Sequence, residues 1–240
     1  MYGERGRLGI IVPSTNTVAE SEFVSIFHRY LPDYSMHVAR VRLVGESAEA
    51  VMKMNAHLKQ AAGDLGTARV SLVAYVCTGG SFYGGAEGEE QVRLLIEGAC
   101  KAPAITSSGS VLRALEYLRV KRIAVFTPYP EDLHRLLLQY LRTCGLEVVS
   151  DRALGVDDPH AIGAVDPEDV YEGARQAFTS GAQAVFLSCT NLRTVEVLQR
   201  LEEDLGVPAV SSNQATAWDC LKRMGVPATS RRNGRLLAEY

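Results

Sequence analysis

The chain has 240 residues, of which 47% are hydrophobic and 22% are charged, and its formal net charge is −3. This length and apolar content suffice for one large domain or two small lobes with a buried core. The slightly acidic balance argues against a nucleic-acid-binding surface, and no apolar run approaches the roughly 20 residues of a membrane helix. The start of the chain leads into a predicted strand rather than a signal sequence. We therefore expect a cytoplasmic protein that binds neither nucleic acid nor membrane.

Short apolar runs alternate with amphipathic segments along the whole chain. The expected strands are 7–13, 36–43, 70–76, 103–106, 121–127, 146–150, 183–188 and 207–210. The expected helices are 18–30, 47–65, 86–100, 108–118, 130–144, 167–180, 193–205 and 213–224. This alternation predicts βαβ units, and hence an α/β fold with mostly parallel sheets and helices on both faces. Ligands of such sheets bind beyond the carboxyl ends of the strands.

The two halves of the chain resemble each other. Three ordered pairs of segments match at a separation of about 110 residues: 8–14 with 122–128, 70–77 with 184–189, and 102–108 with 207–212. Generic α/β patterns raise the chance of such matches, but the constant order and spacing favour a tandem duplication of one α/β unit.

Cys77 and Cys189 end the matching strands Val70–Cys77 and Ala184–Cys189, and each is followed by Thr and a turn residue. Free N–H groups at the start of a following helix would lower the pKa of either thiol. If the halves face each other, both thiols border one cleft from opposite sides, which suits acid–base or nucleophilic chemistry.

The other cysteines fit structural roles. Buried cysteines are commonly small core residues, and we expect this of Cys100, Cys144 and Cys220, which lie in helical patterns. An odd number of scattered cysteines indicates reduced thiols rather than a disulfide framework. No His or Cys lies at the usual ligand spacing from Cys77 or Cys189, so no metal site is expected.

Polar residues at two other strand ends are candidates for substrate contact. After the first strand, Ser14 or Thr17 can cap the next helix, whereas the Asn16 amide can hold a carboxylate or a carbonyl. We favour ligand contact over capping for Asn16, and Ser14 is also a candidate contact. In the second half, Tyr129 lies between two prolines, so its phenol is rigidly presented and could donate to a carboxylate.

The segment from Thr78 to Gly85 is rich in glycine but has neither the phosphate-loop Lys nor the dinucleotide-binding spacing. It predicts an anion-binding nest, in which consecutive N–H groups, starting with Thr78 and Gly79, hold a carboxylate or an enediolate. Thr190 and Asn191 after the second cysteine form a smaller version of this segment.

At these residues the chain resembles the aspartate/glutamate racemase superfamily, in the branch that contains maleate cis–trans isomerases and arylmalonate decarboxylases. The resemblance covers nearly the whole chain. It rests on Ile11-Val-Pro-Ser-Thr-Asn16-Thr with Glu20 and Glu22, Tyr75-Val-Cys77, Thr127-Pro-Tyr129, Ser188-Cys189, Gly206-Val-Pro-Ala-Val-Ser-Ser212 and Gly234-Arg-Leu-Leu237.

The resemblance implies two α/β lobes related by a pseudo-twofold axis, with the active-site cleft between them. The first lobe would comprise residues 1–106 and 213–240, and the second residues 107–212. It implies no cofactor, and a small carboxylate as the substrate. We also expect a homo-oligomer.

The leading functional prediction is maleate cis–trans isomerisation, with Cys77 as the nucleophile that forms a succinyl-thioether and Cys189 as the acid and base. The expected substrate contacts are Ser14, Asn16, Thr78, Gly79, Tyr129, Thr190 and Asn191. Maleate isomerases place an Asn where this chain has Pro159, so amino-acid racemisation by two thiols stays open. A decarboxylase of the arylmalonate type is the third alternative, although those enzymes carry glycine at the position of Cys77. The last is a non-catalytic small-molecule binding protein.

Overall fold

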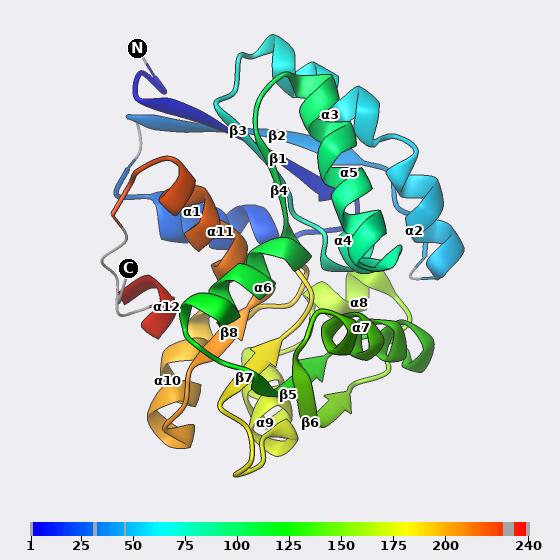
Figure 1. Cartoon of the computed structure of the whole chain (residues 1–240), viewed down its shortest axis with the longest axis vertical. Coiled ribbons are helices and arrows are strands. Elements are labelled where there is room, and N and C mark those ends of the chain that lie inside the picture. Colours follow the sequence, from blue (N-terminus) through cyan, green and yellow to red (C-terminus); the bar gives the residue numbers. More distant parts are fainter. Residues whose placement is uncertain (1, 31–32, 46, 228–232, 239–240) are drawn as a thin grey trace.

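The computed structural model describes residues 2–30, 33–45, 47–227 and 233–238. Residues 228–232 and 239–240 of the expected C-terminal part of the first lobe lie outside this range. The strands of the described chain form two four-stranded sheets, and every strand pair in both sheets is parallel. Figure 1 shows one sheet in the upper half of the molecule and the other in the lower half.

Both sheets have the same strand order. The first has the order β2-β1-β3-β4, with β1 (Gly6–Pro13), β2 (Tyr34–Val41), β3 (Leu72–Tyr75) and β4 (Ala104–Thr106). The second has the order β6-β5-β7-β8, with β5 (Arg122–Thr127), β6 (Glu147–Ala153), β7 (Ala184–Leu187) and β8 (Ala209–Ser211). This shared order is what a duplication of one α/β unit predicts.

The helices follow the strands in alternation. In the first half they are α1 (Ala19–Phe27), α2 (Ala48–Asn55), α3 (Leu58–Thr67), α4 (Thr78–Phe82), α5 (Gly85–Cys100) and α6 (Ser107–Tyr117). In the second half they are α7 (Glu131–Thr143), α8 (Pro159–Gly163), α9 (Pro167–Ala177), α10 (Val195–Leu205), α11 (Ser212–Arg223) and α12 (Arg235–Ala238). None of the helices in the described residues is long and apolar enough to span a membrane.

Burial explains why the central strands read as unbroken apolar runs. Every residue of β3 and β7 is buried, as expected for parallel strands covered by helices on both faces. Helix α11 is also buried along most of its length, because it contacts α1, α6, β3 and β4 as well as β8 of the second sheet. It thus joins the two halves of the molecule (Figure 1).

Three local expectations differ from the structure. The helix expected at 47–65 is two helices, because the chain turns at Ala56 and His57, after Asn55, a residue of low helix propensity. The glycine-rich nest expected after Cys77 is the short helix α4. No helix was expected around Pro159, but residues 159–163 form the short helix α8, which Asp158 caps by accepting a hydrogen bond from the His160 N–H.

Candidate active site

Cys77 and Cys189 border the same small cavity, which lies between the carboxyl ends of the two sheets. Cys77 follows β3 and Cys189 follows β7, which are neighbours of β1 and β5 in equivalent positions. The cavity has a volume of about 30 Å³, and both cysteines are almost fully buried. The two thiols predicted to face each other across a cleft therefore do lie in one site.

The Cys77 sulfur lies at the start of helix α4. Cys77 is the N-cap residue of this helix, and its Sγ accepts a hydrogen bond from the Gly80 N–H at 3.3 Å. The Ser81 hydroxyl donates to the backbone carbonyl of Cys77 at 2.9 Å and so fixes the first turn. Hydrogen bonds from N–H groups stabilise a thiolate more than a thiol, so this position favours a nucleophilic sulfur.

Cys189 has a strained backbone. Its φ angle is 106°, a region that non-glycine residues rarely occupy, and such strain costs of the order of 1–3 kcal/mol. The strained turn aims the side chain at the cavity, where Sγ accepts a hydrogen bond from the Asn191 N–H at 3.4 Å. Strain of this kind persists only where the surrounding structure holds it.

One serine connects the two cysteine-bearing loops. Ser212, the first residue of α11, accepts hydrogen bonds at its Oγ from the Thr78 hydroxyl at 2.9 Å and from the Cys189 N–H at 3.3 Å. Thr190 adds a second link, because its hydroxyl donates to the Val76 carbonyl at 3.2 Å. These contacts set the position of one cysteine relative to the other.

Most of the expected substrate contacts line the cavity. They are Asn16, Thr78, Gly79, Tyr129, Thr190 and Asn191. Ser14 does not line it; its hydroxyl oxygen instead accepts the Leu43 N–H at 3.1 Å and supports the loop after β2. Tyr129 is buried, and its phenol oxygen accepts a hydrogen bond from the Ser188 hydroxyl at 3.3 Å.

Asn16 lies two residues before Val18, the N-cap of α1, and binds the N–H groups at the start of this helix, although ligand contact was favoured over capping for this residue. Its Oδ1 accepts hydrogen bonds from the N–H groups of Val18 at 3.0 Å and Ala19 at 2.9 Å. Its Nδ2 donates to the Thr190 hydroxyl at 3.1 Å. The capping interaction thus fixes the orientation of the Asn16 amide at the cavity wall.

Asn191 is held equally firmly. Its Oδ1 accepts the Thr17 N–H at 2.9 Å, and its Nδ2 donates to the Pro159 carbonyl at 2.7 Å. Pro159, where this chain departs from the maleate isomerase pattern, therefore contacts the site residue Asn191 through its backbone carbonyl.

The cavity wall carries no Asp, Glu, His, Lys or Arg side chain among the described residues. A carboxylate bound there would be held by N–H groups, hydroxyls and amides rather than by an ion pair. The described residues also contain no group of three or more His, Cys, Asp or Glu arranged to hold a metal ion.

Several wall residues were not anticipated from the sequence. Leu43 and Val51, from the loop after β2 and from α2, form an apolar side of the cavity together with Pro13. Nothing in their local pattern distinguishes them from core residues. The cavity of about 30 Å³ has room for little more than a water molecule.

Glu22 is a buried carboxylate at the end of residues 188–194, the loop that carries Cys189 from β7 to α10 and is called the Cys189 loop below. It lies on α1, and its Oε1 accepts the N–H groups of Thr194 at 2.6 Å and Val195 at 2.8 Å. It therefore caps α10, which has no side-chain cap of its own. The Asn213 amide donates both to Glu22 Oε2 at 2.7 Å and to the Thr190 carbonyl at 2.9 Å.

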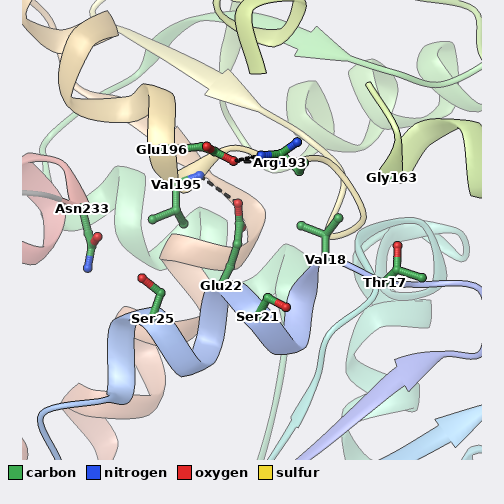
Figure 2. Close-up of a pocket in the computed structure, with 10 residues that line it drawn as sticks. All are labelled: Thr17, Val18, Ser21, Glu22, Ser25, Gly163, Arg193, Val195, Glu196 and Asn233. Carbon is green, nitrogen blue, oxygen red and sulfur yellow. Dashed lines mark hydrogen bonds and ion pairs between the residues drawn. The ribbon is translucent and has the colours of Figure 1, made fainter. Parts of the chain in front are cut away.

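Figure 2 shows Glu22 pointing from α1 to the start of α10, beside a larger cavity of about 560 Å³. Neither cysteine lines that cavity. Thr17 and Gly163 form part of its wall, and both lie next to Asn191, so they stand between the large cavity and the cysteine site.

Burial should make the Glu22 contribution to stability depend on pH. Desolvation raises the pKa of Glu22 above its ordinary value of 4.5, although the hydrogen bonds that it accepts lower it in part. The native state then binds this proton more tightly than the unfolded state. The contribution is present below pH 4.5 and is lost as the pH rises through the raised native value. Urea unfolding from pH 4 to 7 should show this loss in the wild type, and the difference between wild type and Glu22→Gln should change over that window. A constant difference would contradict it.

Comparisons with known proteins agree with this architecture. The family model of arylmalonate decarboxylase matches residues 8–237. The maleate isomerase of Geobacillus stearothermophilus is 28% identical over 97% of both chains. The arylmalonate decarboxylase of Bordetella bronchiseptica is 29% identical over 97% of this chain and 96% of its own.

Solved structures give the same result. A cysteine-to-serine mutant of the Nocardia farcinica maleate cis-trans isomerase, with a covalently bound succinylcysteine intermediate, superposes with a TM-score of 0.93. It is 26% identical, and the match covers 98% of this chain and 99% of that one. The likeness spans enzymes of one fold over their whole length, so this chain is an enzyme. It belongs to the arylmalonate decarboxylase family, whose members similar to it include maleate isomerases.

Proposed function

We propose that this protein is a cofactor-independent isomerase of a small dicarboxylate and that it converts maleate to fumarate. The observation that carries the proposal is the pair of buried thiols, Cys77 and Cys189, which line one small cavity that has no charged side chain in its described wall. The maleate isomerases among the relatives, and the succinylcysteine intermediate in one of them, support this choice of substrate.

In the proposed reaction the Cys77 thiolate adds to one alkene carbon of maleate, and the electron pair of the double bond moves toward the neighbouring carboxylate. The Cys189 thiol then gives its proton to the second alkene carbon. The product is a succinyl-thioether whose central bond is single, so it rotates. Cys189, now a thiolate, removes a proton from the second carbon and is a thiol again. The electrons of that C–H bond form the new double bond, the C–S bond breaks with its electron pair on sulfur, and fumarate leaves Cys77 as the thiolate that began the cycle.

The groups around the cavity supply the electrostatic part of this scheme. N–H groups at the start of α4 and after Cys189 lie beside the two sulfurs, and in this scheme they would stabilise the negative charge that develops on the carboxylate oxygens. Asn16 and Tyr129 line the same wall and would orient the carboxylates. No cofactor is needed, because the protons and the covalent bond come from the two thiols.

The test is incubation of the purified protein with maleate, followed by proton NMR, in which the vinyl signals of maleate and fumarate are distinct. We expect fumarate to accumulate with the wild type and not with a Cys77→Ala, Cys189→Ala double variant. No fumarate with the wild type would refute the choice of substrate.

Racemisation is the second candidate, and the matched hydrogen bonding of the two thiols favours it. Each sulfur accepts a backbone N–H, at 3.3 Å for Cys77 and 3.4 Å for Cys189, so either thiol could serve as the acid or the base in a two-sided proton transfer. With a racemase, a solution of an amino acid such as aspartate would lose its optical activity and the amino acid would take up deuterium from D₂O, without an adduct on the protein.

Carbon dioxide release from an arylmalonate that persists in Cys77→Ala would instead indicate a decarboxylase. Binding of a dicarboxylate without turnover would indicate a binding protein.

A further inference from the structure

A buried tyrosine next to Cys77 has no role in the proposed steps. Tyr75 lies two residues before Cys77 on β3 and is fully buried. Its Oη donates a hydrogen bond of 2.6 Å to Oδ1 of Asn55, the last residue of α2. The Asn55 Nδ2 in turn donates to the Gly80 carbonyl at 2.9 Å. Gly80 is the residue whose N–H binds the Cys77 sulfur.

This network fixes the direction of the Tyr75 hydrogen bond. The Gly80 carbonyl can only accept, so the Asn55 amide must present its nitrogen to Gly80 and its oxygen to Tyr75. The phenol hydrogen therefore points to Asn55 while Cys77 is a thiol. The lone pairs of the phenol oxygen are left for the Cys77 side.

Gly80 allows the phenol and the sulfur to approach each other. A Cβ atom at this position would lie 2.0 Å from the Tyr75 Oη and 3.1 Å from the Cys77 Sγ. No side chain fits there, so the hydroxyl and the sulfur share the space over the Gly80 backbone. Since both atoms lie so close to that one point, the phenol oxygen and the sulfur are at most about 5 Å apart.

We infer that Tyr75 is a catalytic residue that donates a hydrogen bond to the Cys77 thiolate, and that Asn55 is a positioning residue that holds the phenol until the thiolate forms. When Cys77 loses its proton to solvent, the phenol hydrogen rotates from Asn55 Oδ1 to Sγ, and no covalent bond breaks. The thiolate then has two donors, Tyr75 Oη and the Gly80 N–H. This inference rests on the proposed function in that it explains why Cys77 rather than Cys189 is the nucleophile.

The surroundings keep the phenol a donor. Burial, and secondly the neighbouring Cys77 sulfur, raise the pKa of Tyr75 well above its ordinary value of 10.0. It therefore stays protonated when Cys77 ionises. The titratable groups that face Cys77 in the described site are Tyr75, Tyr129 and Cys189, and no acidic or basic side chain lines the cavity to compete with them.

The experiment measures the rate of iodoacetamide labelling of Cys77 against pH, with each cysteine resolved by peptide mass spectrometry. We expect Tyr75→Phe to raise the pH midpoint of Cys77 labelling by about one unit, so that labelling at pH values below both midpoints is about tenfold slower. Tyr34→Phe is the matched control. Tyr34 is also buried, but it pairs with Gly6 at the start of β1, whereas Tyr75 pairs with Ile11 near the end of that strand. The control should leave the midpoint unchanged.

Asn55→Ala tests whether the phenol acts by donating a hydrogen bond to the sulfur or only by packing beside it. It removes the competing acceptor but keeps the phenol, so the Cys77 midpoint should stay unchanged or fall. An unchanged midpoint in Tyr75→Phe, or a rise of equal size in Asn55→Ala, would overturn the inference. Should Tyr75→Phe not fold by circular dichroism, a rise in Asn55→Ala alone would overturn it, and an unchanged or lower midpoint would support it. No substrate is present, so the result stands apart from whether the wild type converts maleate.

Discussion

Cys77→Ser is expected to lose isomerisation by about 10⁴-fold or more, because a serine hydroxyl is a poor nucleophile without a dedicated base. No histidine lines the cavity among the described residues, so none is positioned to activate the new hydroxyl. Intact-protein mass spectrometry after incubation with maleate should show no adduct. The variant should fold normally, since the exchange of sulfur for oxygen changes little volume and costs about 1–2 kcal/mol at most.

Cys189→Ala is the complementary variant, and its expected phenotype is different. Loss of an acid–base group typically costs about 10²–10⁴-fold in rate, but Cys77 can still attack. A mass increase equal to one maleate should therefore accumulate on Cys77. An adduct on Cys189 in the Cys77→Ser variant would reverse the two roles, and no adduct in either variant would favour racemisation.

The second large effect is expected on stability, from Glu22→Ala. The substitution leaves the Thr194 N–H, the Val195 N–H and the Asn213 amide buried without the acceptor that they now share. Each buried donor without a partner costs about 1–3 kcal/mol. We expect the free energy of unfolding to fall by about 3 kcal/mol, and the Tm by roughly 10 °C for a chain of this size.

Glu20→Ala is the control for this measurement, because Glu20 lies two residues away on the same helix. Its partner is Arg40 at 2.6 Å, but both side chains are about 40% exposed, and such surface pairs contribute at most about 1 kcal/mol. Thermal unfolding by circular dichroism should therefore show a small shift for Glu20→Ala and a large one for Glu22→Ala. Equal shifts would mean that the buried carboxylate does not hold the α10 end of the Cys189 loop.

Glu22→Ala should also reduce activity while the protein remains folded. Asn213 is shared between Glu22 and the Thr190 carbonyl, and Thr190 is next to the strained Cys189. With the carboxylate gone, one end of the loop loses its anchor, so kcat should fall more than KM changes, as expected when a reacting group rather than substrate binding is displaced.

The alternation of strands and helices, the parallel sheets and the position of both cysteines at strand ends are predictable from the amino-acid pattern alone. These features are local: β3 and β7 are unbroken apolar runs that stop at a cysteine, and periodicity records burial directly. The resemblance between the two halves also pointed to two equivalent units, and both sheets have the same strand order. Asn16, Tyr129 and Thr190 were identified because polar residues at strand ends border the site in this fold class.

The contacts that join these parts become visible only in the folded structure. The φ angle of Cys189, the link through Ser212, the capping of α10 by Glu22 and the contact of Tyr75 with Asn55 have no signature in local sequence. Glu22 reads as an ordinary acidic residue in the first turn of a helix, yet its partners lie more than 170 positions away. Such contacts depend on how the two sheets and their helices pack. Sequence periodicity indicates which face of a helix or strand is buried, but it does not identify the residues that pack against that face. The pairing of the cysteines was therefore readable from the sequence, whereas the network of contacts around them was not.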